Sequence, residues 1–104
     1  MHKFTYKKLR DDFTLLVTAA RNAQRIPVAK TKKRRVIFDR YIAGRSRRYD
    51  RANFVGGCKP LVDALRSCQL LVDDSERWLD DYYRQYSVVL NTRIEITIQE
   101  LDYA

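Results

Sequence analysis

The residues of this chain with the clearest chemical potential are three acids and a lysine within positions 50–74. Asp50 stands first, Lys59 follows nine residues later, and Asp73 and Asp74 form an adjacent pair beyond it. Carboxylates brought together from separate segments are ligands that magnesium takes in proteins, alongside several waters. A lysine ammonium beside them could neutralise charge on a reacting phosphate. The set is compatible with metal-dependent phosphodiester chemistry, and equally with a loop acid, a helix-start lysine and a turn acid in solvent.

Positive charge is concentrated in the first half of the chain. Residues 1–50 contain fifteen Lys or Arg and four acids, a net charge of +11, whereas residues 51–104 contain six and nine, a net charge of −3. Phosphate binding in one half and metal binding in the other would give this division.

Two basic runs flank a predicted strand, and the second of them leads directly to Asp50. Such runs are usually solvated surface, but this placement favours contacts with backbone phosphates, which fix position and salt dependence and do not read bases. The residues expected to make these contacts are Lys32, Lys33, Arg34, Arg35, Arg45, Arg47 and Arg48.

Length and composition indicate one compact globular domain: 104 residues, of which 45% are hydrophobic, with three glycines and two prolines. No apolar run is long enough to span a bilayer and the start is not signal-like, so we expect a soluble, intracellular protein without a membrane partner. Cys58 and Cys68 would lie about 15 Å apart along one helix, too far for a disulfide. We expect them to be reduced core residues. The only histidine is His2, which argues against a zinc site.

Apolar periodicity outlines the elements that must position these residues. The sequence predicts a helix over residues 4–24, a strand over 36–42, a loop over 50–57, a helix over 59–70, and strands over 81–88 and 93–99. Residues 90–92 would turn between the last two strands in an antiparallel hairpin. The expected fold is therefore α/β (α+β): a small mixed sheet with two helices packed on it.

Two further groups of side chains have competing interpretations. Lys59 and Asp63 should lie on the helix side that faces away from the sheet, where they could serve a site or form an ordinary surface pair. Four aromatic residues could stack on exposed bases, but aromatics near strands more often pack in cores or dimer interfaces, and for most of them we expect the core. These four are Trp78, Tyr82, Tyr83 and Tyr86.

Three segments resemble the pattern of the RusA family of Holliday junction resolvases. That pattern is Asp-x-Asp-Asn, then a lysine followed by an Asp-x-Leu helix, then an Asp-Asp pair. Here it corresponds to residues 47–53, to Lys-Pro-Leu-Val-Asp-Ala-Leu at 59–65, and to Leu-Val-Asp-Asp at 71–74. Arg-Ile-Glu-Ile-Thr-Ile at 93–98 resembles the family's closing strand. The likeness covers roughly residues 47–100, and its motifs are fairly specific together but weak singly.

The resemblance implies a homodimeric endonuclease that binds four-way DNA junctions and nicks paired strands with Mg²⁺, for which Mn²⁺ could substitute. Asp50 and Asp74 match metal-binding carboxylates, and Asp73 beside them is a third candidate ligand. Lys59 matches the essential lysine, so Asp50, Lys59 and Asp74 form the expected catalytic set. Asn53 matches the asparagine after the acid pair and is expected to contact DNA. No organic cofactor is implied, and the expected location is the cytoplasm of a bacterium or a phage-infected cell.

Two features depart from the family pattern. Ala52 stands where the family has its second acid, and the chain is expected to open with a helix where the family has a strand. Two functional hypotheses follow: a metal-dependent junction nuclease, or a junction-binding relative without the chemistry. An RNA-directed or protein-binding module is a third, which has only the charge in its favour.

Overall fold

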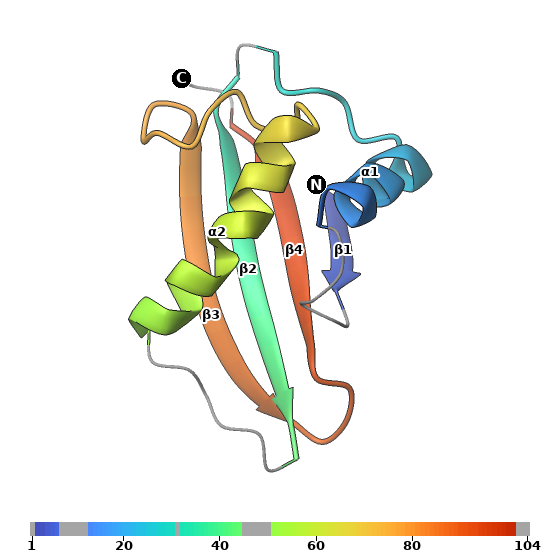
Figure 1. Ribbon diagram of the computed structural model, residues 1–104, viewed down its shortest axis with the longest axis vertical. Helices are drawn as coiled ribbons and strands as arrows, with labels where there is room; N and C mark the ends of the chain where they lie inside the picture. The colour runs from blue at the N-terminus through green and yellow to red at the C-terminus, as the bar shows by residue number, and fades with distance from the viewer. Residues whose placement is uncertain (1, 7–12, 31, 45–50, 102–104) are drawn as a thin grey trace.

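The computed structural model describes residues 2–6, 13–30, 32–44 and 51–101 (Figure 1). Its elements are β1 (His2–Tyr6), α1 (Phe13–Gln24), β2 (Arg34–Ala43), α2 (Arg51–Ser67), β3 (Leu79–Val88) and β4 (Arg93–Glu100). The four strands form one sheet in the order β1-β4-β2-β3. This confirms the predicted small mixed sheet with two helices.

β2 and β4 occupy the centre of the sheet. β2 pairs in parallel with β3, and α2 connects the two, whereas β4 runs antiparallel to both β2 and β1. The predicted hairpin between the last two strands is therefore wrong, because β2 lies between them. Burial explains the arrangement: most residues of β2 and β4 are buried, whereas most residues of β3 are exposed or partly exposed, as befits an edge strand.

The N-terminal segment is a strand and not the start of a helix. β1 pairs with β4 from His2 opposite Ile98 to Tyr6 opposite Ile94, and α1 begins only at Phe13. The prediction of one helix over residues 4–24 is therefore wrong at its start. The expectation that a helix stands in the place of the RusA strand is wrong for the same reason, because His2–Tyr6 form β1.

α2 begins eight residues before the predicted helix, so the expected loop is helical from Arg51 onward. Phe54, Cys58, Leu61 and Leu65 follow one another at helical spacing, and each is at most 3% exposed. This continuous buried stripe outweighs the cost of about 1 kcal/mol that each glycine brings to a helix interior.

Gly56, Gly57 and Pro60 all lie within α2, and all three are exposed on its outer side. A proline within a helix donates no backbone hydrogen bond, and its ring crowds the carbonyl four residues earlier. That carbonyl belongs to Gly56. Local propensity predicted the loop, and tertiary packing overrides it.

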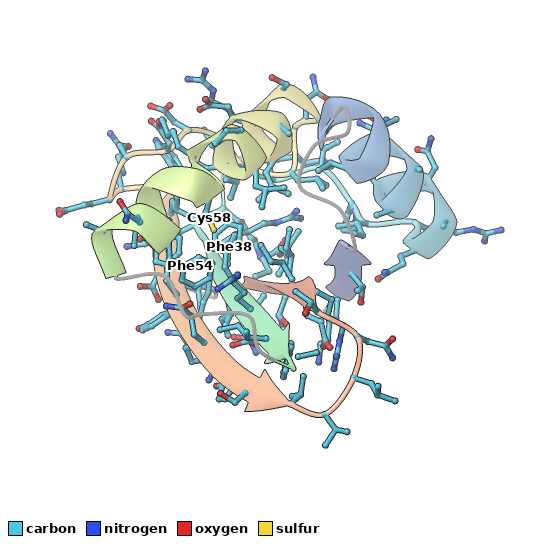
Figure 2. All side chains as sticks on the ribbon, turned by 60° about the horizontal axis from the view of Figure 1, so that its bottom comes forward. Phe38, Phe54 and Cys58 are labelled. Atoms are coloured by element: carbon cyan, nitrogen blue, oxygen red, sulfur yellow. The ribbon has the colours of Figure 1, made fainter. Side chains whose placement is uncertain are left out.

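Both helices lie on the same face of the sheet, with the core between (Figure 2). Phe54 and Cys58 of α2 point toward Phe38 of β2 (Figure 2). The Tyr83 ring of β3 stacks on Phe38 with centroids 5.1 Å apart and meets Phe54 edge-on at 6.0 Å. Tyr83 thus packs against the core as predicted, whereas Tyr82 and Tyr86 are exposed, so the core prediction is wrong for these two.

The two cysteines are free and buried, as predicted. Burial raises the pKa of the Cys58 thiol to about 12. Cys68 lies just beyond α2, where its sulfur is 3.2 Å from the Thr18 hydroxyl of α1. In the part of the chain that the structure describes, neither helix has the length and apolar character needed to cross a membrane.

Candidate metal and phosphate site

The outer side of α2 presents three charged residues at the spacing of one helix face. Lys59, Asp63 and Arg66 are separated by four and then three residues, so successive turns place them above one another. They face away from the sheet because the buried stripe of α2 faces toward it. Asp63 lies on the side of the helix that the sequence predicted. The presence of Arg66 and of the following loop on the same side was not predicted.

The Lys59 ammonium lies between two carboxylates from different segments. Its Nζ is 2.6 Å from Asp74 Oδ2 in the loop after α2 and 3.1 Å from Asp63 Oδ1. Hydrogen bonding to Asp74, and then to Asp63, raises the pKa of Lys59. The same bond holds the pKa of Asp74 below its ordinary value. Lys59 and Asp74 therefore stabilise each other's charged forms, and all three side chains remain accessible to solvent and to a ligand.

The loop after α2 places Asp73 and Asp74 beside the helix. Gln69, with a φ of 64°, reverses the chain direction, and the Leu70 amide donates to the Leu65 carbonyl at 2.9 Å. Leu70 is fully buried and fixes the loop to the core. Asp73 Oδ1 lies 3.6 Å from Arg66 Nη1. The two predicted ligands Asp73 and Asp74 thus reach the charged face of α2.

Carboxylate oxygens are ligands of the kind that magnesium takes, and two ligands of one magnesium ion lie at most about 4.2 Å apart. Asp63 Oδ1 and Asp74 Oδ2 each bind Lys59 Nζ, and these two contacts do not by themselves bring the oxygens within that limit. Lys59 occupies the position between the carboxylates. Within the described residues no three acids, histidines or cysteines gather at one point, and the predicted ligand Asp50 lies outside those residues.

A hollow with an apolar floor and basic residues among its lining adjoins the acidic loop. One depression of about 380 Å³ is lined by Lys30, Arg66 and Gln69 among others, and a second of about 270 Å³ by Lys30, Lys32 and Glu100. Lys30 lines both. Cations that are far apart in the sequence thus border one surface, which continues through Arg66 to Asp73 and Asp74.

The predicted DNA-binding run at the start of β2 divides between two faces. Lys32 and Lys33 keep some exposure, and Lys32 lies 3.4 Å from Glu100. Arg34 is only 2% exposed, and its guanidinium donates to the carbonyls of Leu70 and Val28 and to Glu100. The prediction of a phosphate contact for Arg34 is therefore wrong, because strand alternation turns it into the protein.

The other predicted contacts fall in different places. Arg35 projects from the opposite face of the sheet, where its Nε is 2.8 Å from Asp80 Oδ2. Asn53 is exposed in the first turn of α2 next to Ala52. The remaining predicted residues lie outside the described part of the chain; these are Asp50, Arg45, Arg47 and Arg48.

Arg66 is the site residue that sequence reasoning missed, and the approach of Lys30 to it was not predicted. Arg66 follows Lys59 by seven residues, so the helix period could have placed it on the same face. Lys30 belongs to the first basic run, but its approach to α2 depends on the Ala29 amide donating to the Gln69 carbonyl at 2.8 Å. No local sequence signal announces that bond.

Comparison with known proteins leaves the family open: no family model matches the chain, and no curated protein matches its sequence.

Proposed function

We propose that this protein is a magnesium-dependent, structure-specific endodeoxyribonuclease that nicks four-way DNA junctions. The observation that carries the proposal is Lys59, whose ammonium is held between Asp63 and Asp74 on the same side of α2 as Arg66, which lines the hollow together with Lys30. A phosphate guided along that hollow would meet paired carboxylates and an ammonium together. The choice of four-way junctions as the substrate comes from the resemblance to RusA nucleases.

Each residue has a defined task in this proposal. Asp74, with Asp50 and Asp73, would hold the metal, which supplies an activated water and a Lewis acid when bound. Lys59 stabilises negative charge that develops on the phosphate. Lys30, Lys32 and Arg66 position the backbone without reading bases.

The proposal includes two features that belong to the whole assembly. Two active sites are needed to cut paired strands symmetrically, so the active form is a homodimer. Four-way junctions arise on DNA in the cytoplasm of a bacterium or a phage-infected cell, which is the proposed location.

A junction-binding protein without nuclease activity is the second candidate. Ala52 favours it, because a methyl group in the first turn of α2 cannot coordinate a metal. The basic hollow is compatible with this candidate too. It predicts tight, salt-sensitive binding and no strand cleavage.

The deciding experiment incubates the protein with an end-labelled four-way junction and a duplex of the same sequence. Each is run with Mg²⁺, with Mn²⁺ or with chelator, and then on native and denaturing gels. We expect symmetrical nicks in the junction that require metal. Junction binding without nicks would establish the second candidate, and equal behaviour toward duplex and junction would reject both.

A matched pair of variants tests whether nicking depends on this site. Asp74→Asn should lower the nicking rate about 100-fold, as expected for a lost metal ligand or transition-state contact. Glu76→Gln removes the same charge from an exposed residue of the same loop and should leave the rate unchanged. Equal rates in the two variants would place the active site elsewhere.

Ala52→Asp separates the two candidates further, because it restores the acid of the family pattern. Nicking that appears only in this variant would show that the natural protein binds junctions with its chemistry disabled. An unchanged absence of nicking would show that more than one ligand has been lost.

A further inference from the structure

The second face of the sheet carries a layer of side chains that no described helix or strand covers (Figure 2). Strand pairing fixes its members, since residues opposite one another share a face. They are Lys3 and Thr5 of β1, Arg93, Glu95, Thr97 and Gln99 of β4, Arg35, Ile37, Asp39 and Tyr41 of β2, and Asp80, Tyr82, Arg84 and Tyr86 of β3. This layer is called the open face below.

Tyrosine and arginine dominate the open face. The Tyr41 and Tyr86 rings stack with centroids 5.3 Å apart, and Arg93 lies 4.2 Å above the Tyr41 ring. Arg35 lies 5.4 Å from the centre of the Tyr82 ring, which is itself 46% exposed. Tyrosine and arginine are the residue types enriched at the centres of protein interfaces, where they contribute most of the binding energy.

The open face neutralises its own charge. Asp39 and Glu95 sit opposite each other on neighbouring strands, and both are largely buried beneath the longer side chains. Arg84 makes two hydrogen bonds to Asp39, while Lys3 and Arg93 each lie 2.6 Å from Glu95. With the Arg35–Asp80 pair, the face has four cations and three acids, a net charge of +1 in a chain of +8.

This charge balance identifies the kind of partner. A nucleic acid would require cations that can exchange a carboxylate for a phosphate, as Arg66 can from its half-exposed pair with Asp73, whereas most cations of the open face pair with the largely buried Asp39 and Glu95. A second copy of the chain presents the same nearly neutral face, so two open faces can meet with little repulsion although the whole chain has a charge of +8. Two identical faces related by a two-fold axis could bring the exposed tyrosines of β3 against one another.

The area of the open face is sufficient for a specific interface between two proteins. Four strands spaced about 4.8 Å apart, and about eight residues long at about 3.3 Å each, span roughly 500 Å². Two such faces would bury roughly 1,000 Å² in total, without the extra surface of the projecting side chains. This area reaches the lower limit for a specific interface.

We propose that a second copy of this chain docks against the open face through Tyr82 and Tyr86. A dimer is already part of the proposed function, but its surface is argued here from the open face alone. The two proposals can therefore fail separately, because dimer formation requires neither DNA nor metal.

Sedimentation velocity of the full chain between about 1 and 100 μM tests the proposal. The wild type should sediment as a dimer, at twice the chain mass of 12.4 kDa. The double variant Tyr82→Lys/Tyr86→Lys should raise the dissociation constant at least tenfold. The control Asn22→Lys/Ser67→Lys adds the same charge at exposed helical positions and should remain dimeric.

A second measurement avoids reliance on folding of the lysine variant. Tyr82→Cys, treated with a short thiol-reactive cross-linker, should give a covalent dimer, because the two copies of residue 82 lie close together in the proposed interface. The two native cysteines are buried and should not react. A monomeric wild type would overturn the proposal, and so would a dimer that survives in the lysine variant or dissociates equally in the control. Nicking by a monomeric wild type would leave the proposed nuclease activity standing and remove both the homodimer and this surface.

Discussion

Two groups of ion pairs lie on opposite sides of this molecule and differ in how much solvent reaches them. On the outer side of α2, Lys59 is 56% exposed, and its partner Asp63 is 47% exposed. On the open face, Arg84 is comparably exposed at 52%, but its partner Asp39 is only 5% exposed. The cations of the two groups are similarly exposed to solvent, whereas their acids differ in exposure.

The difference separates charges available to a ligand from charges committed to the fold. Exposed pairs contribute little to stability because water competes for both partners and screens them. A buried acid has no water to replace a lost partner, so its pair is required structurally even where its net contribution is small. The Lys59 group can therefore exchange partners with metal or phosphate, whereas the Asp39 and Glu95 groups maintain the sheet.

Removing the cation of the α2 group should have the largest effect on activity and almost none on stability. Lys59→Met is expected to lower junction nicking about 100-fold and to change the free energy of unfolding by less than about 0.5 kcal/mol. Single-turnover nicking and urea denaturation of the same sample measure both. A loss of stability as large as that expected for Arg84→Met on the open face would contradict the proposed difference between the two groups of ion pairs.

Removing the cation of the open-face group should act on stability. Arg84→Met leaves the buried Asp39 carboxylate without its two hydrogen bonds and should lower the free energy of unfolding by about 2 kcal/mol. Urea denaturation at pH 7 measures the change. Asp39→Asn in the same background should recover part of the loss, because it removes the unpaired charge; if it recovers none, burial of that charge is not the cause.

Lowering the pH should reduce the stability of the fold through Glu95, which belongs to the open-face group of ion pairs. Burial acts to raise the pKa of this carboxyl, but hydrogen bonds from Lys3 and Arg93 outweigh it, so the folded pKa lies below the ordinary 4.5. A depressed folded pKa means that the carboxylate stabilises the fold above pH 4.5 and loses this contribution as pH falls through the folded value. Urea midpoints between pH 7 and 3 should fall less in Glu95→Gln than in the wild type, and parallel curves would contradict the assignment.

The smallest expected effect belongs to the hollow. Arg66→Gln should reduce by about one the slope of log affinity against log salt for junction binding, since one phosphate contact is lost. Its unfolding free energy should stay within about 0.5 kcal/mol of the wild type, because the Arg66–Asp73 pair is about half exposed on both sides. An unchanged salt slope would exclude the hollow from the DNA path.

The sequence predicted those parts of the fold that depend on local pattern. The apolar residues of β2, the alternation in β4 and the buried stripe near Leu61 gave the right element types. The strand at His2–Tyr6 was missed because its partner, β4, is about ninety residues away. The order of the strands was missed for the same reason, since position in a sheet depends on which strands bury both faces.

The site was predictable in part. Lys59 and Asp74 were expected together from the resemblance alone, and the structure places their charged atoms 2.6 Å apart. Arg34 was misassigned because a basic run gives no indication of which residue a strand will turn inward. The position of Lys30 beside α2 was not predicted, because it depends on one backbone hydrogen bond from Ala29 to Gln69.

The pairing of β1 with β4 has a consequence for how the protein is made. β1 has no neighbour in the sheet until β4, which follows it by about ninety residues, has been synthesised, and β4 is also the link between β1 and β2. Contacts between distant segments form late and fold slowly, and unpaired strands favour aggregation while they wait. The basic N-terminal half, repelled by its own charge, would keep nascent chains apart during that interval.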